Sequence, residues 1–181
     1  MADKYFNELA LELHKGASEK DHPFRQFCLG TVGLEGLARL RTVVLRETTE
    51  DLQLFFFTDS RSKKIIHIKE NNKVGLLFYH PKKFLQLRIE GLATVHSNVA
   101  YTKKLWNSIN SANKKDYTTS EAPGSPLGTK TAIDYLDDGN YFCIVEVTPF
   151  KIEYLKLGKP DHLRIHFSKK EEVWSGEFLV P

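Results

Sequence analysis

The sequence predicts a mainly β protein in which an antiparallel sheet closes into a barrel with a few flanking helices. From Arg25 onward, short runs rich in β-branched and aromatic residues alternate with turn residues, a pattern typical of antiparallel strands. Segments with helical spacing are few and short. Tight connections favour closure, because a closed sheet has no exposed edge strands. The length of 181 residues predicts one domain, residues 1–181.

The N-terminal segment, residues 1–20, has helical spacing. Leu9 and Leu13 lie on one face of an amphipathic helix predicted over residues 4–15, and Gly16 is predicted to close it. A helix of this kind is expected to cover the core.

Nine segments have the composition of strands. Their predicted bounds are residues 25–32, 37–47, 52–58, 73–79, 84–97, 140–148, 151–157, 162–168 and 173–179.

Two helices and a long loop interrupt this series. One helix is predicted over residues 62–71 with Ser62 as a candidate N-cap, and the other over residues 98–111, where Val99 and Trp106 are apolar positions. The loop of residues 112–131 contains KKDYTTSEAPGSPLG. Polar loops of this length in compact domains are usually functional or mobile.

Several classes of protein are excluded. No apolar run approaches the ~20 residues that a membrane-spanning helix needs. The N-terminus lacks the basic and apolar regions of a secretion signal, so we expect a cytoplasmic protein. Cys28 and Cys143 lie in apolar runs and are predicted to be free thiols. There is no GxGxxG, P-loop, GxSxG or HExxH motif, so any chemistry is expected to come from a bound cofactor.

The net charge of +3 is small, so anion binding would need local clustering of cations. The segment FFFTDSRSKK brings hydroxyls and cations to a strand end and a helix start, and RLRTVVLR supplies arginines from a neighbouring strand. Hydroxyls, helix amides and cations are the groups that hold a phosphate monoester. A basic surface turn without a ligand is the alternative that composition leaves open.

A second polar cluster is His162, Arg164 and His166, which strand periodicity places on one face. A zinc site is disfavoured, because Arg164 would repel a cation and no third ligand has a characteristic spacing. Nucleic-acid binding is also disfavoured, because the main aromatic run, residues 54–57, is predicted to be buried.

Taken together, RTVVLR, FFFTDSRSKK, LQLRIEG and RIHFSKKEEVWSGEFLVP resemble the pyridoxine 5'-phosphate oxidase family of FMN-binding split barrels. The resemblance extends from about Phe24 to Pro181. It implies an antiparallel Greek-key split β-barrel that binds FMN between the subunits of a homodimer.

The resemblance also implies roles for individual residues. Arg41 matches a cation on the FMN phosphate, and Gln86 matches a glutamine that bonds the isoalloxazine edge. Arg164 matches an arginine near the ring. Tyr154 falls where the family has a flavin-contacting tryptophan, although a one-residue shift would place Leu155 there. The implied cofactor residues are Arg41, Thr42, Val43, Val44, Leu45, Arg46, Phe57, Thr58, Lys63, Lys64, Gln86, Tyr154 and Arg164.

The departures from the family pattern concern the substrate. The family oxidases hold pyridoxine phosphate with an R-x-H pair, of which this chain keeps His162 while Pro160 replaces the arginine. Matching Arg164 and His166 to that pair would require gaps. A tyrosine, arginine and serine of the family fall near Trp106, Asn110 and Lys114. We therefore expect an altered substrate pocket.

The resemblance implies an FMN-dependent oxidoreductase acting on a small molecule, with no nucleic-acid or membrane partner and no metal. His162 is the candidate acid or base, because imidazole titrates near neutral pH. Two alternatives remain: a flavin-binding stress or carrier protein without turnover, and a haem-binding split barrel with His162 or His166 as axial ligand.

Overall fold

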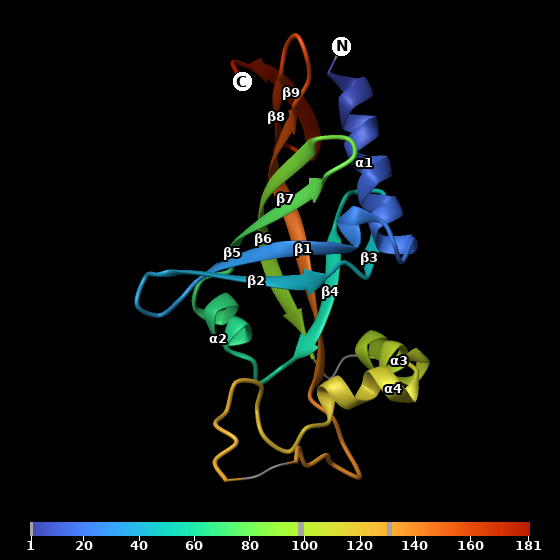
Figure 1. Cartoon of the computed structure of the whole chain (residues 1–181), viewed down its shortest axis with the longest axis vertical. Coiled ribbons are helices and arrows are strands. Elements are labelled where there is room, and N and C mark those ends of the chain that lie inside the picture. Colours follow the sequence, from blue (N-terminus) through green and yellow to red (C-terminus); the bar gives the residue numbers. More distant parts are fainter. Residues whose placement is uncertain (1, 98–99, 130–131) are drawn as a thin grey trace.

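The computed structural model describes residues 2–97, 100–129 and 132–181. In this part of the chain nine strands form one antiparallel sheet, and the helices lie around it (Figure 1). The mainly antiparallel β fold with flanking helices is thereby confirmed. No helix among these residues is long and apolar enough to cross a membrane.

The sheet has the hydrogen-bonded order β2-β1-β5-β6-β7-β4-β3, with β8 and β9 added beside β7. The strands are β1 (Gln26–Val32), β2 (Ala38–Val44), β3 (Glu47–Thr48), β4 (Leu54–Asp59), β5 (Lys73–His80), β6 (Leu85–His96), β7 (Phe142–Lys156), β8 (Leu163–Lys170) and β9 (Val173–Leu179).

The expectation of a closed barrel is wrong. In the described residues β2 pairs only with β1, and β9 pairs only with β8, so the hydrogen-bonded path stays open. The reason is the length of β7, whose first half pairs with β4 and whose second half pairs with β8 on the same edge. The path therefore branches at β7 instead of returning to β2.

Strand β7 runs through the break that was predicted between residues 148 and 151. Gly91 of β6 lies opposite Pro149, and the register shifts there because Phe150 is an extra residue in β7. A bulge accommodates a proline, which has no N–H for the ladder. A Cβ on Gly91 would lie 2.6 Å from Val147 Cγ1, so only glycine fits this close approach.

The helices are α1 (Asp3–Ser18), α2 (Lys63–Glu70), α3 (Ala100–Ser108) and α4 (Ser111–Lys114), with 3-10 turns at Pro23–Arg25 and Lys115–Tyr117. The predicted helix over residues 98–111 is two helices, because the Asn110 side chain accepts from Asn113 N and starts a new one. Asn98 and Val99, where that prediction began, lie outside the described residues, as do residues 130 and 131 of the predicted loop.

Gly16 does not close α1, as the sequence had suggested. The helix continues to Ser18, and a Cβ on Gly16 would lie 2.7 Å from Phe24 Cβ. Gly16 therefore permits close packing of the helix on the turn that follows it. On the outer face of α1, Leu11 is exposed.

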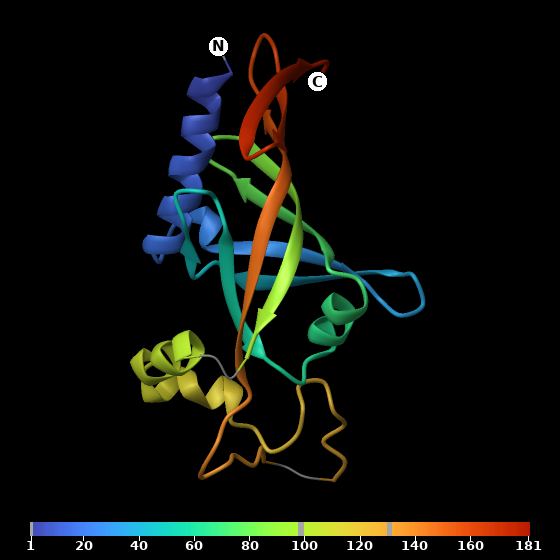
Figure 2. The same ribbon diagram turned by 180° about the vertical axis from the view of Figure 1, so that it is seen from behind.

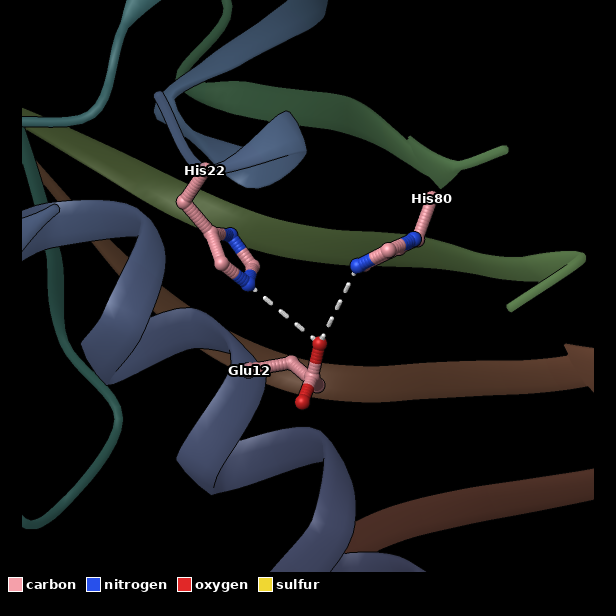
Figure 3. A group of neighbouring side chains, drawn as sticks. All are labelled: Glu12, His22 and His80. Atoms are coloured by element: carbon pink, nitrogen blue, oxygen red, sulfur yellow. Dashed lines mark ion pairs between the residues drawn. The ribbon is translucent and has the colours of Figure 1, made fainter. Parts of the chain in front are cut away.

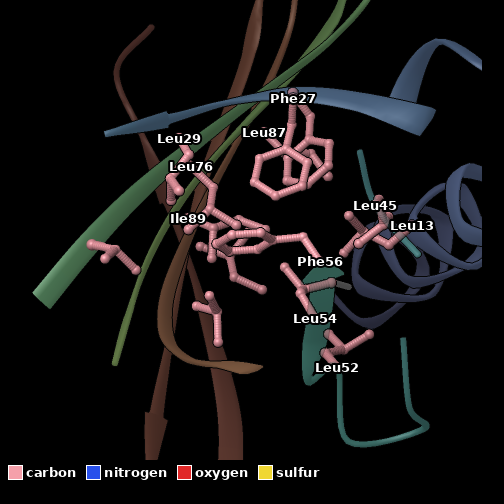
Figure 4. Close-up of a cluster of buried hydrophobic side chains, with 14 of the residues drawn as sticks. Leu13, Phe27, Leu29, Leu45, Leu52, Leu54, Phe56, Leu76, Leu87 and Ile89 are labelled. Atoms are coloured by element: carbon pink, nitrogen blue, oxygen red, sulfur yellow. The ribbon is translucent and has the colours of Figure 1, made fainter. Parts of the chain in front are cut away.

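The main core lies between the strands and α1 (Figure 4). Phe27 stacks on Phe78 with ring centroids 4.7 Å apart, and Leu13 of α1 joins the same cluster. The first turns of α1 pack Phe6 against Phe167 of β8 and Trp174 of β9. Figure 2 shows from behind how α1 runs alongside these C-terminal strands.

Glu12, His22 and His80 are the one group of three His, Cys, Asp or Glu residues in the described chain that is close enough to suggest a metal site (Figure 3). Glu12 Oε2 lies 3.4 Å from His22 Nε2 and 3.8 Å from His80 Nε2, and Lys83 pairs with the other carboxylate oxygen. The carboxylate is 1% exposed.

Hydrogen bonds to the histidines make this cluster unsuitable for a metal ion. His22 Nδ1 accepts from Phe24 N, and His80 Nδ1 accepts from Lys83 N. An accepting nitrogen carries no proton, so the proton of each neutral ring sits on Nε2, facing Glu12. A metal ligand needs the opposite tautomer, with Nδ1–H donating to an acceptor. The cluster instead fastens α1 to the turn after it and to the end of β5.

Burial lowers the pKa of His80 below the ~6.5 of a free imidazole. The unfolded chain then binds this proton more tightly, so stability is complete above about pH 6.5 and declines as the pH falls below it. His80→Asn offers an amide oxygen to Lys83 N but does not titrate. We expect the free energy of unfolding, measured with urea between pH 7.5 and 5, to decline less in this variant than in the wild type. Equal declines would show that His80 does not contribute.

Candidate functional site

Two hydroxyls and a lysine meet where β4 leads into α2. Lys64 Nζ donates to Thr58 Oγ1 at 2.9 Å and to Ser62 Oγ at 3.1 Å, and both hydroxyls are buried. Ser62 is the N-cap residue of α2, as predicted, but its side chain makes no capping bond. Its hydroxyl is directed to Lys64 instead.

Arg41 of β2 approaches the same place from across the sheet. Its NH1 donates to Thr31 Oγ1 at 2.7 Å and to Leu29 O at 3.2 Å. Burial and, next, the positive charge of Arg41 lower the pKa of Lys64, so the two cations act on one another. We call Arg41, Thr58, Ser62 and Lys64 the basic corner.

The basic corner has no carboxylate of its own. The partners of Arg41 and Lys64 are hydroxyl and carbonyl oxygens, which carry no charge. Asp59 acts on Lys64, but both of its oxygens bind Arg61, at 3.1 and 2.7 Å. Two partly buried cations that form no ion pair with the described residues, beside two hydroxyls, fit the phosphate of FMN, because a dianion would satisfy all four groups.

An open groove lies beside the basic corner, between β2 and α2. Its volume is about 660 Å³, and its polar lining consists of Glu35, Arg39, Arg41, Lys63 and His67. Glu35 pairs with Arg39 at 3.0 Å, so Arg41 and Lys63 are not bound by it. Lys63 is exposed at the first position of α2. The structure thus gathers Arg41, Thr58, Lys63 and Lys64 from the predicted set.

The rest of the RTVVLR segment runs away from the basic corner. Thr42 is exposed, Val43 and Val44 are half-buried, and Leu45 is fully buried in the core. Arg46 lies beyond β2, with its guanidinium 5.5 Å from the centre of the Phe57 ring. Arg46 Nε is buried and has no hydrogen-bond partner, so it retains a donor for a ligand.

Gln86 and Arg164 belong to a second group of residues, on β6 and β8, the two strands that pair with β7 on opposite edges. Gln86 of β6 pairs with Leu155 of β7, and Leu155 pairs with Arg164 of β8, so the three share one face. Arg164 Nε is buried without a hydrogen bond and lies 4.0 Å from Glu153. We call Gln86, Leu155 and Arg164 the ring group, after the role that the resemblance gave to two of them.

Tyr154 lies on the opposite face. Its side chain is completely buried, packs on Tyr5 and donates its hydroxyl to Glu8 of α1 at 2.9 Å. Leu155, the alternative position, is half-exposed beside Gln86 and Arg164. The geometry of the strands therefore favours Leu155 as the residue available to a ligand.

The ring group lies far along the sheet from Thr58, the β4 residue of the basic corner, whereas Arg41 is level with Ile89 through β1 and β5. The hairpin that contains Gln86 is beside α1, whereas β6 ends near α3 at the level of β4 and α2 (Figure 1). From Gln86 to His96, level with the end of β4, β6 spans ten residues, or about 33 Å along the strand. One chain does not bring all the predicted cofactor residues together.

The predicted histidine face is brought together in part. Arg164 and His166 share a face of β8, but His162 precedes the strand and is exposed in the turn after β7. His162 Nδ1 accepts from Gly158 N at 3.2 Å, which leaves Nε2 as the proton-bearing atom of the neutral ring.

Two residues of the site were missing from the predicted set. Ser62 was considered only as a cap and as part of a basic cluster, although its hydroxyl lies two positions from Lys64. Arg61 binds Asp59, so this carboxylate does not pair with Lys64. The spacing of Asp59 and Arg61 in the DSR segment was the sequence pattern that could have indicated this pair.

Comparisons with known proteins show the family of this chain. Residues 4–97 match the family model described as "Pyridoxamine 5'-phosphate oxidase, FMN-binding domain". A pyridoxine/pyridoxamine 5'-phosphate oxidase from Leptospira biflexa is 30% identical over 166 residues, covering 84% of this chain and 77% of that enzyme. The enzyme of the same name from Haemophilus influenzae is 29% identical over 166 residues, covering 84% and 78%.

Solved structures agree as well. A pyridoxamine 5'-phosphate oxidase-related, FMN-binding protein from Nostoc punctiforme matches with a TM-score of 0.78 and 26% identity, over 98% of this chain and 97% of that one. PhzG from Burkholderia lata, solved with tetrahydrophenazine-1-carboxylic acid, has a TM-score of 0.70 over 99% and 90% of the chains at 15% identity, which shows the shared fold alone. The chain belongs to the pyridoxamine 5'-phosphate oxidase family of FMN-binding domains.

Proposed function

We propose that this protein binds FMN and acts as an oxidoreductase on a small molecule, with a substrate pocket that differs from that of the vitamin B6 oxidases. The observation that carries the proposal is the basic corner, in which Arg41 and Lys64 face neutral oxygens and form no ion pair in the part of the chain that the structure describes. Bound FMN would supply hydride transfer at its ring.

The residues of this chain would bind and orient that cofactor. Lys64 and Arg41 would neutralise the phosphate, and Thr58 and Ser62 would donate their hydroxyl protons to it once Lys64 turns toward the anion. Gln86 and Arg164 would lie against the ring, where a guanidinium favours a negatively charged reduced state. Exposed His162 would exchange protons with substrate through Nε2.

Removing Lys64 should weaken FMN binding because a charge-assisted contact to the phosphate is lost. A contact of this kind contributes about 1.5 to 3 kcal/mol, so Lys64→Ala should raise the Kd for FMN by roughly 10- to 150-fold. Flavin fluorescence quenching measures this Kd, and Arg41→Ala should act in the same direction. Lys69→Ala, on an exposed position of the same helix, is the matched control.

Riboflavin separates a phosphate contact from a general loss of structure. It lacks the phosphate, so Lys64→Ala should leave its Kd nearly unchanged. Equal weakening of FMN and riboflavin binding would contradict the assignment of the phosphate to the basic corner.

We further propose that the protein works as a homodimer with FMN between the subunits. About 33 Å of strand separates Gln86 from the level at which β4 ends beside Thr58, and the ring group of a partner subunit would supply flavin contacts at that end. A two-fold axis would juxtapose the basic corner of each subunit with the ring group of the other. The open edges at β2 and β9 leave backbone groups for such an assembly.

A mixed dimer tests this arrangement. When Lys64→Ala and Gln86→Ala chains are combined, one site of each heterodimer should carry both substitutions and the other neither. We expect half of the sites to bind FMN with wild-type affinity, although both parent homodimers bind weakly. Titration of the isolated heterodimer measures this stoichiometry. Two weak sites, or a monomer by analytical ultracentrifugation, would contradict the shared site.

The altered pocket is expected to discriminate against pyridoxine 5'-phosphate. Pro160, which replaces the arginine of the family pair, is exposed in the turn between β7 and β8 and has no side-chain donor. Lys114, near the serine position of the family, holds its Nζ 4.9 Å from the Trp106 ring. It can meet a phosphate only as a point charge.

The purified protein should therefore be yellow and form little pyridoxal 5'-phosphate from pyridoxine 5'-phosphate in air. Pro160→Arg should increase this activity, because arginine binds phosphate through two parallel hydrogen bonds. Absorbance of the product measures the rate. Rapid turnover by the wild type would contradict the altered pocket.

A flavin carrier without turnover is the second candidate, and the loss of the arginine at Pro160 favours it equally. Reduction of the bound flavin by candidate donors, followed by oxygen consumption, distinguishes the two. An oxidoreductase would be reduced and reoxidised repeatedly, whereas a carrier would release intact FMN.

A further inference from the structure

Arg61 lies in the turn between Thr58, near the end of β4, and Ser62, the N-cap of α2. Its Nε and NH2 bind the two oxygens of Asp59, at 3.1 and 2.7 Å. The Asp59 side chain is 3% exposed and that of Arg61 is 20% exposed, so this is a largely buried fork-to-fork pair. Thr58 and Ser62, which hold Lys64, flank the pair in sequence.

The same guanidinium also binds a loop almost sixty residues away. NH1 donates to Ser120 O at 2.9 Å, and NH2 donates to Thr119 O at 2.8 Å. The guanidinium carbon lies 3.3 Å from the centre of the Tyr141 ring. Backbone bonds continue the connection, because Ser60 N donates to Tyr141 O at 2.7 Å.

This loop forms the wall of a cavity of about 450 Å³. Ser120, Pro126, Ile133 and Tyr135 are among its lining residues, and Ser120 N donates to Asp134 O across it. Apart from Arg61, the described contacts of the Thr119–Ser120 segment are within the loop itself. The Arg61 fork is therefore the side-chain contact that joins this segment to the turn between β4 and α2, while Tyr117, two residues earlier, is buried in a second hydrophobic cluster.

We propose that Arg61 is a positioning residue that couples the cofactor phosphate to the loop cavity. The inference rests on the proposed binding of FMN at the basic corner. A phosphate held by Thr58, Ser62 and Lys64 fixes the turn between them, and the fork of Arg61 transmits that constraint to Thr119 and Ser120. Cofactor binding then orders the cavity wall, which would receive a small molecule after the flavin is in place.

Thermodynamic reciprocity makes the coupling measurable. If FMN stabilises the loop in the position that Arg61 holds, that loop position strengthens FMN binding by the same factor. Couplings between sites are commonly about 5- to 150-fold. Riboflavin, which lacks the phosphate, should not produce this effect. A purely structural contribution of Arg61 to folding would not distinguish the two ligands.

Amide hydrogen exchange at Ser120 and Leu136 reports opening of the loop, because these amides bond to Asp134 O and Thr118 O. In the wild-type protein we expect saturating FMN to slow their exchange about 5-fold or more, and saturating riboflavin to leave it unchanged. Arg61→Lys keeps a positive charge beside Asp59, but it lacks the planar guanidinium that donates to both Thr119 O and Ser120 O. In this variant FMN should still bind, and the loop amides should exchange at the same rate with and without it.

Arg88→Lys is the matched control, since Arg88 is an exposed arginine of β6 that pairs with one carboxylate, that of Glu153 on β7. It should retain the slowing by FMN. If Arg61→Lys fails to fold, the double variant Asp59→Asn, Arg61→Met removes both buried charges and serves in its place.

The outcomes separate the inference from the proposed function. Absence of FMN binding by the wild type would overturn both. Binding of FMN without slower exchange of the loop, or equal slowing by riboflavin, would overturn the role of Arg61 alone. Persistent slowing by FMN in Arg61→Lys would also overturn it.

Discussion

The architecture depends on β7, a fifteen-residue strand that is bonded along both edges. One edge pairs with β6 from Ile144 to Lys156, and the other is divided between β4 and β8. Continuity through Pro149 requires the bulge at Phe150 and the absence of a side chain at Gly91. Because β4 carries Thr58 of the basic corner and β8 carries Arg164 of the ring group, the division of β7 sets the separation between these two residues.

Electrostatics at the basic corner oppose folding and favour binding. Arg41 and Lys64 repel one another and form no ion pair with the described residues, which costs free energy, and partial burial increases that cost. Asp59 is close enough to neutralise Lys64, yet Arg61 occupies both of its oxygens. The buried Asp59 carboxylate therefore binds Arg61, and Lys64 is available to an external anion. A dianion bound at the basic corner would offset the repulsion between Arg41 and Lys64.

Local chemistry made much of this structure predictable. Alternation of apolar residues in β6, the helix after Ser62 and the cations of FFFTDSRSKK were visible in the sequence, and the resemblance gave FMN as the ligand. Contacts between distant segments were not visible. Gly16 looked like a helix terminus because its close approach to Phe24 depends on tertiary packing. Pro149 looked like a strand break because the bulge that accommodates it depends on Gly91 of another strand.

The same limit explains why the sequence alone did not decide whether Tyr154 or Leu155 faces the ligand side of β7. A resemblance aligns positions, but consecutive residues of a strand point to opposite faces, so a shift of one residue exchanges core and ligand face. The ladder settles the face, because Gln86 and Arg164 both pair with Leu155. Tyr154 faces α1, where burial and the hydrogen bond to Glu8 raise the pKa of its hydroxyl and keep it protonated. Tyr154 consequently holds the N-terminal helix against the sheet, while Leu155 is partly exposed on the other face, between Gln86 and Arg164.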